Sequence, residues 1–319
     1  MGYTVGTRGS ALALTQTGMV ADAIGRICNQ NIERVTVKTE GDILTGPLSQ
    51  MGGTGVFAAT LRQRVLDGSV DMAVHSLKDL PTQPCPGLNI AAIPEREDPR
   101  DALCARDGLT LETLPEGANV GTGSPRRAAQ IKALRPDINI VDIRGNVGTR
   151  LARVPGLEHY GNAEAVGDCD AVILAAAGLH RLGYESAISE YLDVSRVLPA
   201  PGQGALAVEI REQDVHNNTE LAQAVATVDH LPTRYAVIAE RAVLRRLEAG
   251  CASPIGTYAR YEQDQLILDA VVASVDGSQV LRHHAATVLL SQESAEQLGI
   301  QVAEDLLQMG ADRLNGLNS

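Results

Sequence analysis

The chain begins with a strand pattern, a glycine-bearing loop and a helix pattern in close succession: Tyr3-Thr-Val-Gly-Thr7, Arg8-Gly-Ser10 and Ala11–Ile27. Residues 3–7 are rich in β-branched side chains, which favour strands. The same succession recurs over the first two thirds of the chain. This alternation predicts an α/β fold with mostly parallel or mixed sheets and helices on both sheet faces.

Two series of strand and helix units are expected. In the first series we expect strands at Val35–Thr39, Val70–Ser76 and Asn89–Ile93 and a helix at Gly55–Leu66. In the second series we expect strands at Ala102–Ala105, Asn119–Thr122, Ile138–Ile143 and Ala171–Ala175. Its helices are expected at Pro125–Leu134, Val147–Val154 and Ala176–Leu182.

Two proline-bounded stretches, residues 94–99 and 198–204, indicate crossings between lobes. The second crossing leads into the strand-like Ala205–Glu209, so the chain is expected to return to its first lobe. We therefore predict domain 1 at residues 1–95 and 199–222, domain 2 at 100–198 and domain 3 at 226–319.

The final third indicates a smaller α+β domain. Tyr235–Glu248 has apolar residues at near-helical spacing. Leu266–Ser274 and Gln279–Val288 flank an Asp-Gly pair, which predicts a hairpin. A last helix is expected at Ser291–Leu307, with Ser291 as a candidate N-cap.

Composition excludes several functions for these 319 residues. A net charge of −12 disfavours nucleic acid as a partner. No apolar run is long enough for a membrane span, and the first residues contain no signal-peptide core. Five cysteines without a C-x-x-C spacing argue against a disulfide framework and a zinc site, so no metal is expected and a reducing cytoplasm fits best.

Three arginine-bearing loops follow predicted strands: residues 7–10, 121–127 and 144–150. Each places glycine, serine or threonine amides near a helix start, which suits an anion. Arg126 and Arg127 in a first helical turn oppose the helix dipole, and an anionic ligand would remove that conflict. The alternative is that these arginines pair with acidic residues of the chain. Three such loops in one scaffold favour a site for anionic ligands.

Two further residues are candidates for chemistry. Asp79, beside Lys78, is either a catalytic carboxylate or an ordinary N-cap before Pro81. His75 is more typical of a hydrogen-bonded strand-end residue than of a general base. Cys251 lies in a glycine-flanked turn after a helix pattern, where the dipole disfavours a thiolate. Such a thiol suits attack on a strong electrophile better than hydrolysis.

Several motifs in order make the chain similar to the porphobilinogen deaminase (hydroxymethylbilane synthase) family. The motifs are Thr7-Arg-Gly-Ser10, Ala73-Val-His-Ser-Leu-Lys-Asp-Leu-Pro81, Glu95-Arg-Glu-Asp-Pro-Arg-Asp101, Arg144-Gly-Asn-Val-Gly-Thr-Arg150, Gly202-Gln-Gly-Ala205 and Gly250-Cys251. The resemblance implies two lobes like periplasmic binding proteins, with a cleft between them, and a third domain with a cofactor-bearing cysteine. It implies a cytoplasmic monomer that condenses four porphobilinogen molecules into hydroxymethylbilane with release of ammonia, in tetrapyrrole biosynthesis.

The resemblance also implies roles for particular residues. Cys251 matches the residue that carries a dipyrromethane cofactor through a thioether, and Asp79 matches the catalytic aspartate, which overturns the N-cap interpretation. The anion-binding arginines match Arg8, Arg126, Arg127, Arg144, Arg150 and Arg181. Polar contacts to cofactor and substrate match Ser10, Ser76, Lys78, Thr122, Gly123, Ser124, Thr149 and Gln203, and Gln16 and Asp42 lie in matching motifs. Arg96 matches an arginine of the hinge.

The chain departs from the family pattern in places. Gln50 and Thr54 stand where many relatives have lysine, and Glu40 where some have arginine. Val154–Asp168 is polar, loop-like and longer than usual for the family. Two rival functions are a non-catalytic bilobal anion-binding protein, which leaves Cys251 unexplained, and a thiol hydrolase, which leaves the arginine loops unexplained.

Overall fold

The computed structural model describes residues 2–37, 55–161, 164–247, 253–288 and 291–315. It divides into two compact units. The first unit comprises residues 1–97 and 205–237, and the second comprises residues 98–204 and 238–319. Each unit has its own sheets and core.

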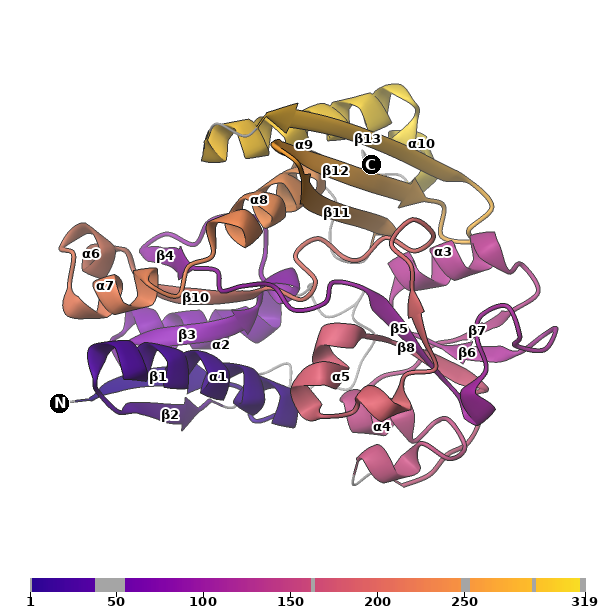
Figure 1. The fold of residues 1–319 in the computed structure, drawn as a ribbon, viewed down its shortest axis with the longest axis horizontal. Helices are drawn as coiled ribbons and strands as arrows, with labels where there is room; N and C mark the ends of the chain where they lie inside the picture. Colours follow the sequence, from indigo (N-terminus) through magenta and orange to yellow (C-terminus); the bar gives the residue numbers. More distant parts are fainter. Residues whose placement is uncertain (1, 38–54, 162–163, 248–252, 289–290, 316–319) are drawn as a thin grey trace. The chain divides into compact units, whose positions relative to one another are not determined.

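The first unit contains a five-stranded sheet in the order β2-β1-β3-β10-β4 (Figure 1). Its strands are β1 (Tyr3–Thr7), β2 (Ile32–Thr36), β3 (Met72–Ser76), β4 (Leu88–Ala92) and β10 (Leu206–Arg211). β1 runs parallel to β2 and β3, whereas β10 is antiparallel to β3 and β4. The strand that follows the second crossing is therefore inserted inside the sheet.

Helices cover both faces of this sheet. On one face α1 (Ala11–Cys28) and α7 (Glu220–Ala226) bury residues such as Ile24 and Val225 against Met72. On the other, α2 (Gly55–Leu66) buries Leu61 and Val65. The short α6 (Glu212–His216) follows β10 directly, and the 3-10 turn η3 (Leu77–Asp79) follows β3.

The second unit contains a matching sheet in the order β7-β6-β8-β5-β9. Its strands are β5 (Asp101–Ala105), β6 (Asn119–Gly121), β7 (Asn139–Val141), β8 (Ala171–Ala175) and β9 (Glu190–Leu192). β6 is parallel to β7 and β8, and β5 is antiparallel to β8 and β9. One face packs on α3 (Pro125–Leu134) and the other on α4 (Val147–Leu151) and α5 (Ala176–Leu182). Short 3-10 turns are η4 (Arg106–Gly108), η5 (Glu158–Tyr160) and η6 (Glu185–Ala187).

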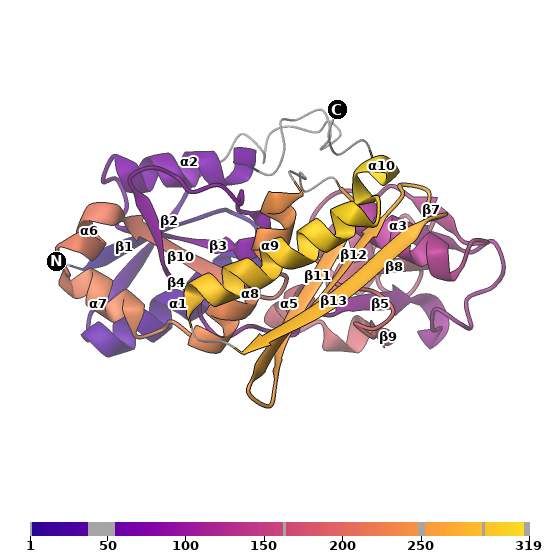
Figure 2. The same cartoon turned by 90° about the horizontal axis from the view of Figure 1, so that it is seen from above.

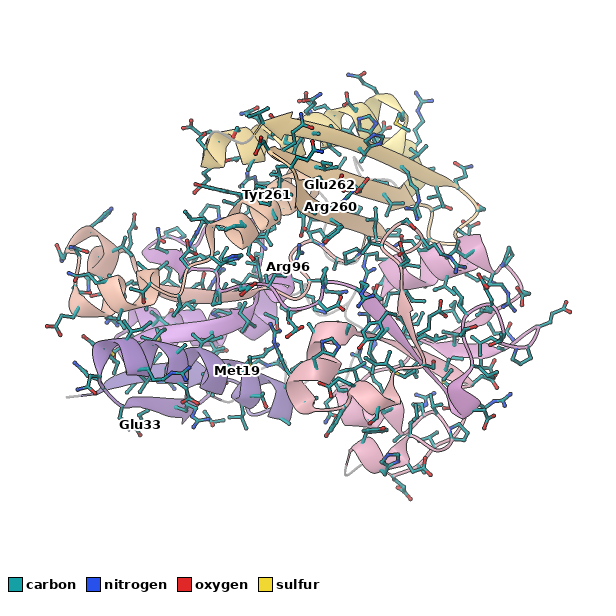
Figure 3. The ribbon with its side chains drawn as sticks, in the orientation of Figure 1. Met19, Glu33, Arg96, Arg260, Tyr261 and Glu262 are labelled. Carbon is teal, nitrogen blue, oxygen red and sulfur yellow. The ribbon has the colours of Figure 1, made fainter. Side chains whose placement is uncertain are left out.

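The second unit also contains an antiparallel three-stranded sheet, β11 (Ile255–Glu262), β12 (Gln265–Ala273) and β13 (Val280–Val288). Figure 2 shows α9 (Gln292–Gln308) running along this sheet, with α10 (Ala311–Asn315) after it. Figure 3 labels Arg260 and Glu262 near the end of β11, where Arg260 Nε donates to Glu262 Oε1 at 2.7 Å. α8 (Leu231–Arg246) precedes the sheet in the chain.

Most expected elements are confirmed. α2, α3 and α5 have the expected bounds, and Ser291 caps α9 by accepting from the Ser294 amide. β2 begins three residues earlier than expected, and β11 was not expected at all. The prediction of mostly parallel or mixed sheets is confirmed in its mixed form, because the inserted strands β5 and β10 pair antiparallel with both neighbours.

The two compact units are divided at other residues than the three predicted domains, and the division into three domains stays a prediction. Residues 199–204 belong to the second unit, where the Gly202 amide donates to Glu240 Oε2 at 2.7 Å. Residues 226–237 belong to the first unit, because Asp229 Oδ1 accepts from the Ile93 amide at 2.7 Å and Val237 enters its core. No helix in the described part of the chain is long and apolar enough to cross a membrane.

Candidate functional site

Two polar loops meet at one edge of the first sheet. β1 and β3 are parallel neighbours, so their carboxyl ends lie at the same edge. Residues 8–10 follow β1, and residues 77–79 follow β3 as η3. The topology thus brings Arg8 and Ser10 to the edge that carries Lys78 and Asp79.

Hydrogen bonds fix this edge to its surroundings. Ser10 Oγ caps α1 by accepting from the Ala13 amide at 3.3 Å. The Ser76 hydroxyl donates to Gln16 Oε1 at 3.1 Å, which joins the end of β3 to α1. Four of the predicted site residues, Ser10, Gln16, Ser76 and Asp79, therefore belong to one connected segment of the fold.

Asp79 is the last residue of η3 and is half-buried. Leu80 after it is extended, so no helix begins there and Asp79 is not an N-cap. Within the described part of the chain, no hydrogen bond or ion pair engages the Asp79 carboxylate. A half-buried carboxylate at a sheet edge is suited to accept N–H groups from a ligand.

A buried ionic cluster lies beneath this edge. Arg62 of α2 binds Glu209 of β10 through two hydrogen bonds, of 3.0 and 2.7 Å. His75 Nε2 lies 3.2 Å from Glu209 Oε2, out of line for a good hydrogen bond. Burial alone would raise the pKa of Glu209, yet His75 and Arg62 lower it to about 2. His75 is thus a buried residue at the end of β3 that lies beside Glu209, whereas the sequence favoured a hydrogen-bonded strand-end residue.

A second set of loops follows the parallel strands of the second unit. β6, β7 and β8 end at one edge, where residues 122–124, 142–146 and the start of α5 lie. Ser124 caps α3 by accepting from the Arg127 amide, and Thr122 Oγ1 accepts from the Ser124 amide at 3.2 Å. A side chain at Gly123 would lie 2.6 Å from the Ile143 carbonyl oxygen, so glycine is required there.

Arg126 and Arg127 are held by a buried carboxylate of the chain itself. Arg126 Nη1 lies 2.6 Å from Asp101 Oδ2, and Arg127 Nε lies 2.9 Å from Asp101 Oδ1. All three side chains are buried. Of the two interpretations of these arginines, the structure favours pairing with an acidic residue of the chain, since Asp101 balances them. Contact of either arginine with a ligand stays a prediction.

Burial by itself would raise the pKa of Asp101, but the two guanidinium groups hold it far below its ordinary value. Asp101 was not among the residues predicted for the site, although it holds two of them in place. It ends a quoted motif, yet the expected strand began one residue later. The sequence feature that could have indicated it is an acidic residue directly before the apolar run Ala-Leu-Cys-Ala, which is predicted to be a buried strand.

Gln203 and Arg181 tie the second crossing to this sheet. Gln203 Nε2 donates to Asp101 Oδ1 at 2.9 Å and to the Pro99 oxygen at 2.7 Å. Arg181 Nη2 donates to the Gly204 oxygen at 2.7 Å. Arg96, labelled in Figure 3, lies at the other crossing, where its amide donates to Thr233 Oγ1 at 3.1 Å.

The loop after β7 and the start of α4 carry several polar side chains between residues 142 and 150. Arg144 is exposed and pairs with the exposed Asp142 at 3.2 Å, a contact that is worth little in water. Arg150 Nε donates to the Gly145 oxygen at 2.9 Å, and Thr149 bonds Asn146. The guanidinium groups of Arg144 and Arg150 and the hydroxyl of Thr149 are donors of the kind that bind carboxylate groups.

Several predicted residues lie outside the described part of the chain. These are Cys251, Asp42 and the three departures from the family pattern, Glu40, Gln50 and Thr54. Among the described residues, no cluster of histidine, cysteine and acidic side chains could hold a metal ion.

The sheets and loops define a class of protein, a mixed α/β chain with polar loops at one edge of each of two five-stranded sheets and an added α+β segment. Residues 3–219 match the family model "Porphobilinogen deaminase, dipyromethane cofactor binding domain", and residues 234–308 match "Porphobilinogen deaminase, C-terminal domain". The chain therefore belongs to the porphobilinogen deaminase family. It is a transferase of porphyrin biosynthesis with a region that binds the dipyrromethane cofactor.

Curated relatives extend the match over nearly the whole chain. Porphobilinogen deaminase of Micrococcus luteus is 52% identical over 354 residues, which cover 98% of this chain and 94% of the relative. That of Cutibacterium acnes is 52% identical over 318 residues, covering 96% and 95%. A periplasmic substrate-binding protein of an ABC transporter from Coxiella burnetii is a structural neighbour, with TM-score 0.44, 14% identity and coverage of 71% and 91%.

Proposed function

We propose that this chain condenses four porphobilinogen molecules head to tail into hydroxymethylbilane. Each addition forms a C–C bond between the aminomethyl carbon of one pyrrole and the free α-carbon of the terminal ring. The C–N bond of the aminomethyl group breaks, ammonia leaves and the α-carbon loses its proton. Hydrolysis releases the finished tetrapyrrole. The family match over nearly the whole chain carries this proposal.

Asp79 is the proposed catalytic residue. Its carboxylate lies at the end of β3, half-buried, where it can accept pyrrole N–H groups. The same negative charge stabilises the cation that forms on the substrate as ammonia leaves. It also assists proton transfer to the leaving amine.

Arginine loops are the proposed carboxylate sites. Each pyrrole ring carries one acetate and one propionate, so negative charge accumulates as the product lengthens. Arg8 lies at the Asp79 edge, whereas Arg144 lies on the exposed loop after β7 and Arg150 lies in α4 of the second unit. Guanidinium groups bind carboxylates through paired hydrogen bonds, which explains arginine-rich loops in a protein of net charge −12.

Cys251 is the proposed attachment point of dipyrromethane. When bound, the cofactor supplies the first free α-carbon to which pyrroles are added. The contacts proposed for the cofactor and substrate are Thr149, Ser10, Ser76, Lys78, Thr122, Gly123, Ser124, Arg126, Arg127, Arg181, Gln203, Gln16 and Asp42. We further propose a cytoplasmic monomer of three domains that binds neither nucleic acid nor membrane. No observation favours the non-catalytic anion-binding protein or the thiol hydrolase.

Intact-protein mass tests the cofactor. The purified chain should carry an adduct of the mass of dipyrromethane, and Cys251→Ser should lack it. A fully active protein of unmodified mass would contradict the proposal.

Turnover tests Asp79. Asp79→Ala should keep the adduct or a precursor of it, and lose turnover by about 10²–10⁴-fold, the usual contribution of a proton-transfer group. Asp22→Asn is a matched control, because Asp22 is exposed on α1 of the same unit. Near-normal release of ammonia by Asp79→Ala would remove Asp79 from the mechanism.

A further inference from the structure

Between α4 and β8 the chain forms a long connection, here called the excursion (residues 152–170). Backbone hydrogen bonds join its two ends. The Val166 amide donates to the Ala152 oxygen at 2.9 Å, and the Cys169 amide donates to the Arg153 oxygen at 2.9 Å. The Arg153 guanidinium also pairs with Asp168 through two hydrogen bonds. The first and last residues of the excursion are therefore held together by backbone and side-chain hydrogen bonds.

Its first half, residues 155–161, packs directly on α4. A Cβ placed on Gly161 would lie 2.5 Å from the Gly148 Cα, and one placed on Gly148 would lie 2.7 Å from the Gly161 Cα. Backbones approach this closely only where neither residue has a side chain. The backbone of Gly161 thus packs directly on the backbone of Gly148 in the first turn of α4.

A tyrosine ties the excursion to the region after α5. The Tyr160 hydroxyl lies 2.7 Å from Ser186 Oγ, and its ring centroid lies 5.4 Å from that of Tyr184. Leu157 and Tyr160 also pack against the cluster that contains the buried Leu151. Residues 155–161 therefore bridge α4 and the segment beyond α5.

α4 needs such support. It has only five residues, and a helix of one turn has almost no stability by itself. Yet it carries Thr149 and Arg150, and the Arg150 side chain bonds back to the Gly145 oxygen. The position of both donors is set by what packs on α4.

We propose that residues 155–161 are a positioning segment, which holds α4 so that Thr149 and Arg150 face the carboxylates of the growing pyrrole chain. The inference rests on the proposed function of those two residues as carboxylate contacts. Its structural half, support of α4 by Gly161, does not depend on that function.

Gly161→Ala tests the structural half by hydrogen exchange. The added methyl group overlaps Gly148, so the amides of Arg150 and Ala152, which bond within α4, should exchange at least about tenfold faster. Val166→Ala is the control, because Val166 is 59% exposed on the same excursion and its loss should leave exchange unchanged. Tyr160→Phe, which loses only the Ser186 bond, should give a smaller increase. Unchanged exchange in Gly161→Ala would overturn the proposal.

Kinetics test the functional half. Gly161→Ala should raise KM for porphobilinogen about tenfold with kcat changed by less than about twofold, because binding contacts are lost without loss of chemistry. In the double variant with Arg150→Ala, Gly161→Ala should raise KM by clearly less than it does alone, since only its effect through Thr149 remains. Faster exchange with an additive effect on KM would refute positioning. If Arg150→Ala alone left KM unchanged, the carboxylate role proposed for Arg150 would fail instead.

Discussion

Replacing Asp101 by asparagine removes the charge that balances two buried arginines. Asp101 is fully buried, and it receives hydrogen bonds from Arg126, Arg127 and Gln203. Asparagine has nearly the same shape but no charge, so two guanidinium groups stay buried with no counter-ion. Removing one partner of a buried ion pair costs about 3–5 kcal/mol. Whole domains have unfolding free energies of only about 5–15 kcal/mol.

Urea unfolding followed by far-UV circular dichroism measures this loss. Two compact units can unfold in separate steps, so the midpoint of each transition should be compared with the unchanged chain. We expect Asp101→Asn to lower the midpoint of the second unit, with Asp142→Asn as a control because its pair with Arg144 is exposed.

The pH dependence gives an independent check. The folded pKa of Asp101 lies far below its ordinary value, so its stabilisation is complete above about pH 4 and declines as pH falls toward the folded pKa. The Asp101→Asn variant should lack, at every pH, the part of the unfolding free energy that ionised Asp101 contributes. If Asp101→Asn unfolded within about 1 kcal/mol of the unchanged chain, the arginines would not depend on Asp101 and the reasoning would be refuted.

Three further predictions follow from buried groups. Glu209 has a pKa lowered to about 2, so its stabilisation should disappear between about pH 4.5 and 2, and Glu209→Gln should remove this part of acid unfolding. Gly299→Ala should destabilise the chain by about 1–3 kcal/mol in thermal unfolding, because its Cβ would lie 2.2 Å from the Ala239 oxygen. Burial raises the pKa of Cys104 to about 12, so native protein at pH 8 should alkylate at Cys85 but not at Cys104.

Each of these predictions has a control. Gln301→Ala, at an exposed position on the same helix as Gly299, should leave the melting temperature unchanged. Labelling of Cys104 at the rate of Cys85 would show that the second sheet opens readily. An acid-unfolding curve unchanged by Glu209→Gln would mean that Arg62 and His75 do not depend on that carboxylate.

The sequence predicts the local elements of this fold well, where side chains mark their ends. The helix at 125–134 has Ser124 as N-cap and Pro125 in its first turn, and the helix at 176–182 ends at Gly183, which has φ of 70°. Strand direction was not predictable in this way. The pattern of β10 is that of any buried strand, and its antiparallel pairing depends on the route of the chain.

The candidate site likewise has local features that the sequence predicts and long-range contacts that it does not. The arginine loops were identified from the sequence because they follow predicted strands, and Asp79 was identified through the family motif; the structure brings the β1 and β3 loops to one edge. The partner of Arg126 was not identified, because it lies 25 residues away and only the folded sheet brings the two together. Local pattern therefore predicts where a charged residue lies, but not whether it serves a ligand or the core.

The inserted strand β10 has a consequence for how the chain folds during synthesis. β4 has β10 as its sole neighbour in the sheet, and Arg62 and Glu209 are 147 residues apart. Residues 1–97 leave the ribosome first, but their sheet cannot be completed until β10, residues 206–211, has been made. Such long-range pairing slows folding and leaves strand edges exposed meanwhile. The segment that carries Asp79 is thus among the first parts made and the last completed.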